Sequence, residues 1–334
     1  MTVANPTLIG PSPLDLGTAF CSAKVLLSAL EVDLFSELAA GPATAEEVQA
    51  KVGLHPRGAR HFLDALVVLG LLERSAGRYH NGAYAGRYLV RGPEYAGGFL
   101  DGANHVLYPA WGGLTAALRT GRPQATGDLE EMLRDPDRRR GYLAMMDSLS
   151  GPLADQIADA CDWRRFATLA DIGGARGNLA GLLLNRFPQL TATVFDRPQN
   201  GPACEEHRRN LGVAERLSFR GGDFFADALP QADILVIGHV LADFSPEQRR
   251  TLVRKAYQAV RPGGALLIYD PMLDEQAPEL TSLVASLHLL VMTPAGSAYP
   301  VAECRSWLTD SGFVGVTAIP ARLGNTIVVG QRAG

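Results

Sequence analysis

The chain has 334 residues, of which 47% are hydrophobic and 20% charged, a composition typical of a globular protein longer than one average domain. Its 35 acidic and 31 basic residues give a formal net charge of -4, which offers no overall positive field to a nucleic acid. The four cysteines stand far apart without metal-ligand spacing. The sequence therefore predicts no zinc or other metal site, no disulfide framework and a reducing, cytoplasmic location.

The N-terminus gives no sign of export or membrane insertion. Residues 1–15 contain no basic region followed by an apolar core. No uninterrupted apolar run reaches the ~20 residues that a membrane span requires. We therefore expect no membrane association.

The first hundred residues predict helices followed by a small hairpin. Apolar residues recur at helical spacing over 16–38, and Thr44 opens a capping-box pattern that extends to about Val52. A further helix follows His55-Pro56, and residues 72–79 resemble a hairpin. This order is that of a winged helix. Between residues 41 and 82, however, five basic residues face four acidic ones, which favours a packing or dimerisation role over DNA binding.

The character of the chain changes near Phe166, after further helices over 95–150. Strands and helices then alternate, with strands expected at 168–172, 191–195, 217–220, 234–237 and 265–269. Such alternation specifies a mostly parallel sheet with helices on both faces, and a hairpin around Gly324-Asn325 closes it. We predict three segments: a helical domain (1–100), a helical connection (101–160) and an α/β domain (161–334).

A glycine turn follows the first strand of this α/β domain. The run Asp171–Gly177 directly precedes a helix, where backbone amides can closely approach a nucleotide cofactor. Asp196 comes 19 residues after Gly177, at the end of the next strand, and can accept both ribose hydroxyls. A nicotinamide dinucleotide would suit that pair equally well. Two further features distinguish this site from a nicotinamide dinucleotide site: the acid before the glycines and the run Gly222–Phe225. The acid of that run can bind an adenine amino group beside an aromatic ring.

Five motifs in order give the chain a family resemblance. They are Asp171–Gly177, Phe195–Pro198, Gly222–Phe225, His239–Phe244 and Arg261–Gly264. Together they resemble the S-adenosylmethionine-dependent O-methyltransferases of the caffeic acid, hydroxyindole and polyketide-tailoring type, over nearly the whole chain. The resemblance implies a Rossmann-like class I methyltransferase domain with an N-terminal all-α winged-helix-like dimerisation domain. It also implies a homodimer, S-adenosylmethionine as cofactor with S-adenosylhomocysteine as product, and an aromatic or polyketide acceptor.

The resemblance assigns the cofactor residues. Asp171, Gly173 and Gly177 would line the methionine end and Asp196 the ribose, while Asp223 and Phe224 would hold the adenine, with a core role for Phe224 as the alternative. The predicted cofactor-binding residues also include Gly174, Arg197, Gly222 and Phe225. Ala175 replaces a frequent family glycine, which narrows the turn by one methyl group without abolishing binding.

The acceptor side departs from the family. Its O-methylating members use the histidine of a Leu-His-Asp-Trp segment as general base, and this chain has Ala242 there. Of the two acids that flank that base, one is shortened to Asp270 and the other is lost from the segment 295–300. We take His288, Asp270 and His239 as catalytic candidates, with hydrogen-bonded structural histidines as the alternative. Asp243 alternatively caps the helix that begins near Pro246. The acceptor-pocket candidates are His105, Tyr108, Trp111, Met146, Ala242, Asp243, His288, Met292 and Tyr299.

Three enzymatic interpretations follow from the missing histidine. Methyl transfer, most readily to oxygen, needs no base if the acceptor is already nucleophilic, because alignment supplies much of the catalysis. Alternatively, His288 replaces the base from another wall. In the third, the fold keeps its cofactor and catalyses hydroxylation, decarboxylation or cyclisation of the metabolite. A winged-helix regulator that senses S-adenosylmethionine is the hypothesis from a different class, and the charge count disfavours it.

Overall fold

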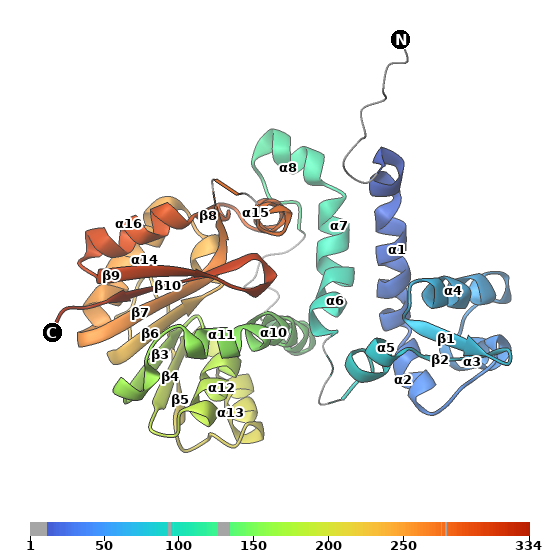
Figure 1. Ribbon diagram of the computed structural model, residues 1–334, viewed down its shortest axis with the longest axis horizontal. Coiled ribbons are helices and arrows are strands. Elements are labelled where there is room, and N and C mark those ends of the chain that lie inside the picture. Colours follow the sequence, from blue (N-terminus) through green and yellow to red (C-terminus); the bar gives the residue numbers. More distant parts are fainter. Residues whose placement is uncertain (1–11, 93–94, 96, 126–133, 275, 278) are drawn as a thin grey trace, which may run out of the picture. The chain divides into compact units, whose positions relative to one another are not determined.

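The computed structural model describes residues 12–92, 95, 97–125, 134–274, 276–277 and 279–334, and the chain divides into two compact units (Figure 1). The N-terminal unit is Met1–Asn104 and the C-terminal unit is His105–Gly334. The boundary divides the predicted connection, residues 101–160, so that most of it belongs to the C-terminal unit. The prediction that residues 1–15 carry no export signal falls mostly on residues 1–11, which lie outside the described residues.

The N-terminal unit has the predicted order of helices and hairpin. The Thr44 capping box is confirmed, because the Thr44 hydroxyl accepts from the Glu47 amide while the Glu47 carboxylate accepts from the Thr44 amide. The antiparallel hairpin is confirmed as well. The elements are α1 (Pro13–Glu31), α2 (Leu34–Ala39), α3 (Ala45–Val52), α4 (Pro56–Val68), β1 (Leu72–Ser75), β2 (Arg78–Asn81), α5 (Ala83–Tyr88) and α6 (Gly98–Gly102).

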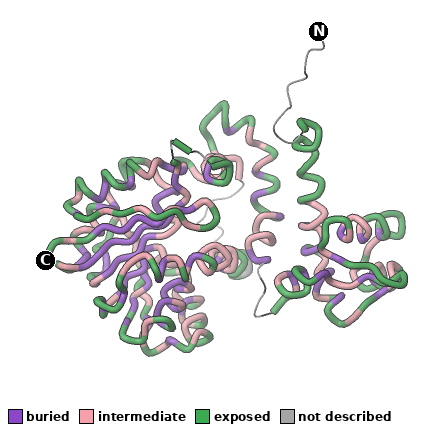
Figure 2. The backbone as a smooth tube through the Cα atoms, viewed as in Figure 1, coloured by how far each residue is buried: buried purple, intermediate pink, exposed green. Residues whose placement is uncertain are grey.

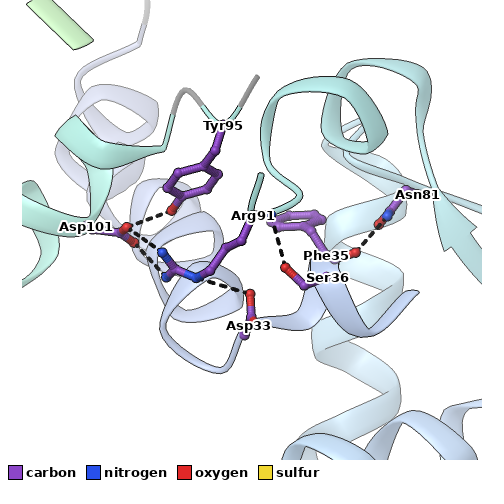
Figure 3. A network of polar contacts seen from close by, with 7 residues as sticks. All are labelled: Asp33, Phe35, Ser36, Asn81, Arg91, Tyr95 and Asp101. Carbon is purple, nitrogen blue, oxygen red and sulfur yellow. Dashed lines mark hydrogen bonds and ion pairs between the residues drawn. The ribbon is translucent and has the colours of Figure 1, made fainter. Parts of the chain in front are cut away.

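The single helix predicted over residues 16–38 is wrong, because the chain breaks between α1 and α2. Asp33 takes a left-handed conformation (φ 53°), which a regular helix excludes. Arg91 stabilises the break: its Nε lies 3.3 Å from Asp33 Oδ1 and its Nη1 lies 3.2 Å from Asp101 Oδ2, which also accepts from the Tyr95 hydroxyl (Figure 3). A polar network distant in sequence thus sets this helix boundary.

Helix α1 leaves apolar side chains uncovered. Leu14, Leu16 and Phe20 are 75%, 67% and 56% exposed. Among the described residues, α1 is the one helix long and apolar enough to cross a membrane by length and composition, with a mean hydropathy of 1.2 over its best window. The sequence of α1 contains no uninterrupted apolar run of the length that a membrane span requires, because Asp15 and Lys24 interrupt it. This face needs a covering surface of some kind.

The C-terminal unit begins with helices and continues as an α/β domain. A π-helical segment, Ala103–Leu107, leads into it. Its helices are α7 (Tyr108–Trp111), α8 (Leu114–Thr120), α10 (Pro136–Ser150), α11 (Ala154–Asp159), α12 (Asn178–Arg186), α13 (Gly201–Asn210), α14 (Pro246–Ala259), α15 (Leu280–Met292) and α16 (Val301–Ser311). Its strands are β3 (Thr168–Ile172), β4 (Thr191–Asp196), β5 (Leu217–Gly221), β6 (Ala232–Gly238), β7 (Val260–Leu273), β8 (Tyr299–Pro300), β9 (Val314–Pro320) and β10 (Asn325–Gln331).

The predicted parallel sheet with an antiparallel end is confirmed. The strand order is β5-β4-β3-β6-β7-β10-β9, and β8 pairs with β7. Strands β3 to β7 pair in parallel, whereas β10 runs antiparallel to both β7 and β9. The chain leaves β3 toward β4 on one side and later places β6 on the other. Ligands of open α/β sheets bind at the carboxyl ends of the strands around such a reversal.

Both faces of the sheet are covered, so its strands are buried (Figure 2). One hydrophobic cluster joins the sheet to α11, α12 and α13, and the other joins it to α14 and α16 (Figure 1). Alternate residues of β3 illustrate this: Leu169 belongs to the first cluster, and Ala170 and Ile172 to the second. Double coverage explains why the strands are continuous apolar runs.

Candidate active site

The turn between β3 and α12 brings backbone close to polar groups. Gly173 and Gly177 have φ values of 75° and 80°. A Cβ at Gly173 would meet Val240 Cγ2 at 2.4 Å, and one at Gly174 would meet Asp171 Oδ2 at 2.5 Å. Ala175 also adopts a left-handed conformation (φ 53°), so the methyl group that departs from the family pattern strains the turn by about 1 kcal/mol.

Two buried carboxyl groups flank this turn. Asp171 is 4% exposed, and within the described residues no donor reaches its Oδ2. Burial, reinforced by the nearby Asp196 carboxylate, raises the pKa of Asp171 to about 7. Burial also raises the pKa of Asp196, although this carboxylate accepts from the Ala175 and Arg197 amides and from Asn200 Nδ2. Among the described residues, these two carboxyl groups therefore keep at least one hydrogen-bond acceptor oxygen, Asp171 Oδ2, without a protein donor.

An aromatic cluster lies after β5. Gly222 packs under the Phe195 ring, since a Cβ there would come within 2.6 Å of it. Asp223 Oδ1 accepts from the Phe225 amide at 2.8 Å. The rings of Phe224, Phe225 and Phe244 have centroids 4.9 to 5.6 Å apart. Phe224 thus packs edge-to-face within this cluster, and no hydrogen bond reaches the second Asp223 oxygen from the residues that the structure describes.

Side-chain hydrogen bonds join helix α10 to the glycine turn, a contact that was not predicted from the sequence. Asp147 accepts from Arg176 Nε at 2.8 Å, and Asn178 Nδ2 donates to the Ser150 hydroxyl at 3.2 Å. Burial raises the pKa of Asp147, while Arg176 opposes this rise. A cleft of about 210 Å³ lies beside this contact, between α10 and α13. Burial, with Asp243 and Asp196 adding to it, raises the pKa of Tyr142 on α10, so this helix also bears on the site.

Ala242 stands on a rigid wall. It is 2% exposed, and its carbonyl accepts from the Ser297 amide at 2.8 Å. Behind it, the Tyr299 hydroxyl donates to Asp270 Oδ2 at 2.8 Å, and both residues are almost fully buried. Burial raises the pKa of Asp270 to about 8. The guanidinium of Arg249, 2% exposed, donates to the Leu241 carbonyl at 2.9 Å and lies over the Tyr299 ring.

The comparisons with known proteins decide the family. Residues 111–314 match the O-methyltransferase domain, and residues 14–91 match the O-methyltransferase dimerisation domain. The chain belongs to the O-methyltransferase family. It is similar to the tetracenomycin polyketide synthesis 8-O-methyl transferase of Streptomyces glaucescens, at 42% identity and 96% coverage of both chains. It is also similar to an N,N-dimethyltransferase of Streptomyces rimosus, at 39% identity and 93% coverage of both.

Solved structures agree with this assignment. The chain superposes on human N-acetylserotonin methyltransferase, solved in complex with S-adenosylmethionine, with a TM-score of 0.88, 27% identity and 96% coverage of both chains. The mitomycin 7-O-methyltransferase structure gives a TM-score of 0.85 at 28% identity, again with 96% coverage of both. This O-methyltransferase family member is accordingly a methyltransferase enzyme.

The residues around the glycine turn fit the cofactor predicted for this methyltransferase. Within the described part of the chain no donor reaches the buried Oδ2 of Asp171, and Gly174 lets the backbone pass close to this carboxyl group, since a Cβ there would lie 2.5 Å from it. Asp196 and Asp223 stand at the carboxyl ends of the next two strands. Gly173, Gly177, Arg197 and Gly222 belong to the connections that follow β3, β4 and β5. The structure thus brings the predicted cofactor residues to one edge of the sheet; their roles stay predictions.

The predicted catalytic residues of this methyltransferase occupy different environments. His239 has a φ of 51°, and its Nε2 lies 2.8 Å from Asn325 Oδ1. Because Asn325 Nδ2 donates to the Arg322 carbonyl, its Oδ1 is the acceptor and His239 Nε2 carries the proton. Burial lowers the pKa of His239, and it also lowers that of His288, which is half-buried. Asp270 is closed off by Tyr299.

The remaining acceptor candidates separate into packed and open groups. Trp111 and Met292 pack in a small cluster around Ala110, Ala117 and Val291. His105 and Tyr108 are exposed on the C-terminal unit, and Met146 is half-buried on α10. Tyr299, at 1% exposure, contacts Asp270 rather than open space. The alternative cap role of Asp243 is wrong, because Ser245 caps α14 and accepts from the Gln248 amide.

Proposed function

We propose that this methyltransferase acts on a phenolic hydroxyl of an aromatic or polyketide-type metabolite. S-adenosylmethionine is the cofactor, and it supplies a methyl group bound to a sulfonium, a strong electrophile. The observation that carries the cofactor site is the buried Asp171 Oδ2, which no donor reaches among the described residues, beside a turn with no room for a Cβ at Gly173 or Gly174. A polyketide acceptor is supported by the tetracenomycin relative, which matches this chain over 96% of both lengths.

Each part of the site has a task in this reaction. Asp171 and the glycine turn would hold the amino-acid end of the cofactor, Asp196 its ribose and Asp223 its adenine. Because the displacement is in line, positioning contributes a large share of the rate. The wall around Ala242, held by Arg249, would orient the acceptor oxygen toward the methyl group.

The direct test measures transfer of isotopic label. Purified protein is incubated with methyl-labelled S-adenosylmethionine and a panel of 3-hydroxy-1-naphthoate, 1,8-dihydroxyanthraquinone and 1-aminonaphthalene. We expect label in a hydroxylated acceptor with an equal amount of S-adenosylhomocysteine. Transfer to the amine alone would contradict the choice of oxygen, in line with the N,N-dimethyltransferase relative. Turnover without S-adenosylhomocysteine would support the repurposed fold, which the alanine at position 242 keeps as the second candidate.

We also propose that the enzyme is a homodimer in the cytoplasm. Residues 14–91 match a dimerisation domain, and the exposed Leu14, Leu16 and Phe20 on α1 supply an apolar face for a second copy. Four free cysteines, two of them buried, fit a reducing compartment. Native mass spectrometry at micromolar concentration should give the dimer, and a monomer would contradict this proposal.

A further inference from the structure

The loss of the family histidine leaves the origin of proton removal open. Of the titratable groups near Ala242, Asp270 is 0% exposed and accepts the Tyr299 hydroxyl. His239 is engaged through Nε2 with Asn325. Asp243 and His288 are half-buried, and within the described residues neither side chain has a hydrogen-bond or ion-pair partner. Asp243 and His288 are therefore the two candidate proton acceptors.

The backbone that carries Asp243 is held in place from several directions. The 3-10 turn Leu241–Asp243 is closed by the Asp243 amide, which donates to the Val240 carbonyl at 3.1 Å. Arg249 and Ser297 donate to the two preceding carbonyls. Gly296 packs so closely that a Cβ there would lie 3.1 Å from Asp243 Cα. The backbone at Asp243 is thus fixed, and within the described residues its carboxyl group is left available to a ligand.

Charged and titratable groups face Asp243 from three other elements. Arg249 of α14 favours the ionised form of Asp243, and the Asp243 carboxylate adds to the burial that raises the pKa of Asp270 of β7. Tyr142 of α10 faces both acids, since Asp243 and Asp196 add to the burial that raises the pKa of its hydroxyl. Burial is the largest influence and raises the pKa of Asp243 to about 7. A base that titrates near the working pH transfers protons most effectively.

His288 lacks these features. It lies on α15, and burial is the cause of its lowered pKa as far as the described residues go. Within the described residues, nothing orients its ring by a hydrogen bond. A catalytic histidine normally has one nitrogen held by a partner, which fixes its tautomer.

We propose that Asp243 is the general base of this enzyme, one residue after the position where the family histidine is replaced by alanine. This inference rests on the proposed O-methyl transfer. The acceptor O–H bond breaks and its proton moves to a carboxylate oxygen of Asp243. The acceptor oxygen forms the new O–C bond while the C–S bond breaks, and that electron pair stays on sulfur. The proton then leaves Asp243 for solvent.

The test uses Asp243→Asn, which keeps the shape of the side chain and removes its basicity. Calorimetry with S-adenosylhomocysteine should show binding within a few-fold of wild type, which controls for the cofactor site. For the acceptor that receives label, kcat/KM should fall about 100-fold or more. The rise of wild-type kcat/KM with pH through about 7 should disappear in the variant.

A second measurement reads the carboxyl group without turnover. In protein labelled with ¹³C at aspartate Cγ and loaded with S-adenosylhomocysteine, the resonance missing from Asp243→Asn should titrate near neutral pH. Asp243→Glu should keep part of the activity and the pH-dependent rise. His288→Gln is the matched variant, and in it the Asp243 resonance should still titrate near neutral pH.

Three results would overturn the proposal: an Asp243 resonance that titrates near 4, an Asp243→Asn variant within tenfold of wild-type kcat/KM, or loss of the pH-dependent rise in His288→Gln alone. Failure of all acceptors to take label would instead contradict the proposed function. The titration of the Asp243 resonance in the S-adenosylhomocysteine complex does not depend on that outcome, so the two failures are distinguishable.

Discussion

At the glycine turn, Asp196 receives hydrogen bonds from the Arg197 amide and Asn200, its neighbours in the chain, and from the Ala175 amide of the preceding connection. At the Ala242 wall, Asp270 instead receives the Tyr299 hydroxyl, 29 residues away, and Arg249 donates to Ser297, 48 residues away. The predicted cofactor side is thus built mostly from short motifs, whereas the proposed acceptor side depends on side chains brought together by the fold. The acceptor side should therefore be the more sensitive to loss of a single distant partner.

The largest effect should come from Arg249→Met. This change removes the guanidinium bonds to the Leu241 carbonyl, at 2.9 Å, and to the Ser297 carbonyl, at 2.8 Å, in a buried environment, while the Leu241 carbonyl keeps the Phe244 amide as a donor. A hydrogen bond from a charged group contributes about 1.5–3 kcal/mol, so we expect the free energy of unfolding to fall by about 3 kcal/mol. Urea denaturation measures this. The exposed neighbour Arg250→Met is the matched control and should change stability by less than about 0.5 kcal/mol. Equal losses in the two variants would contradict a special role for the buried guanidinium.

Gly173→Ala should have the next largest effect, this time on the cofactor side. The new Cβ would meet Val240 Cγ2 at 2.4 Å in a left-handed conformation. Overpacking and backbone strain together should cost about 2 kcal/mol of stability and weaken S-adenosylhomocysteine binding at least tenfold by calorimetry. Gly121→Ala has a similar positive φ with nothing within 4 Å, so it should lose only about 1 kcal/mol and bind normally. Unchanged binding in Gly173→Ala would mean that the cofactor does not lie against this turn.

The smallest predicted effect, counted per pH unit, is a dependence of the free energy of unfolding on pH from Asp270. Its pKa in the folded state, about 8, lies above the ordinary 3.8, so the folded protein holds a proton that the unfolded chain releases. Its contribution to stability is therefore complete below about pH 4 and is lost as pH rises toward 8, by up to about 1.4 kcal/mol per pH unit. Asp270→Asn should flatten the decline in urea midpoint between pH 5 and 8. A wild-type midpoint that rises over this range, with the variant unchanged, would refute the assignment.

Much of the fold follows from the sequence. The strands of the sheet and the hairpin after Gly324 are marked by local apolar runs and turn residues. The break at Asp33 does not, because Arg91, far along the chain, holds it. Helix boundaries that depend on such a partner carry no local signal.

The site divides in the same way. The acids and glycines that follow β3, β4 and β5 are visible as motifs. The pairing of Tyr299 with Asp270 and of Asp147 with Arg176 depends on tertiary contacts and was not predicted. Arg249 left one signal that could have been used: it falls on the helical stripe of Leu252, Val253 and Ala256, where a charged residue must be buried with partners.

Ala175 gives the cofactor turn a property that a glycine would lack. Its methyl group restricts the unfolded backbone more than a glycine does, and its amide donates to Asp196 at 2.6 Å, which joins the ends of the first two strands. The entropic cost of shaping this loop is therefore met during folding, before any nucleoside arrives. Association should then proceed with little rearrangement of the main chain.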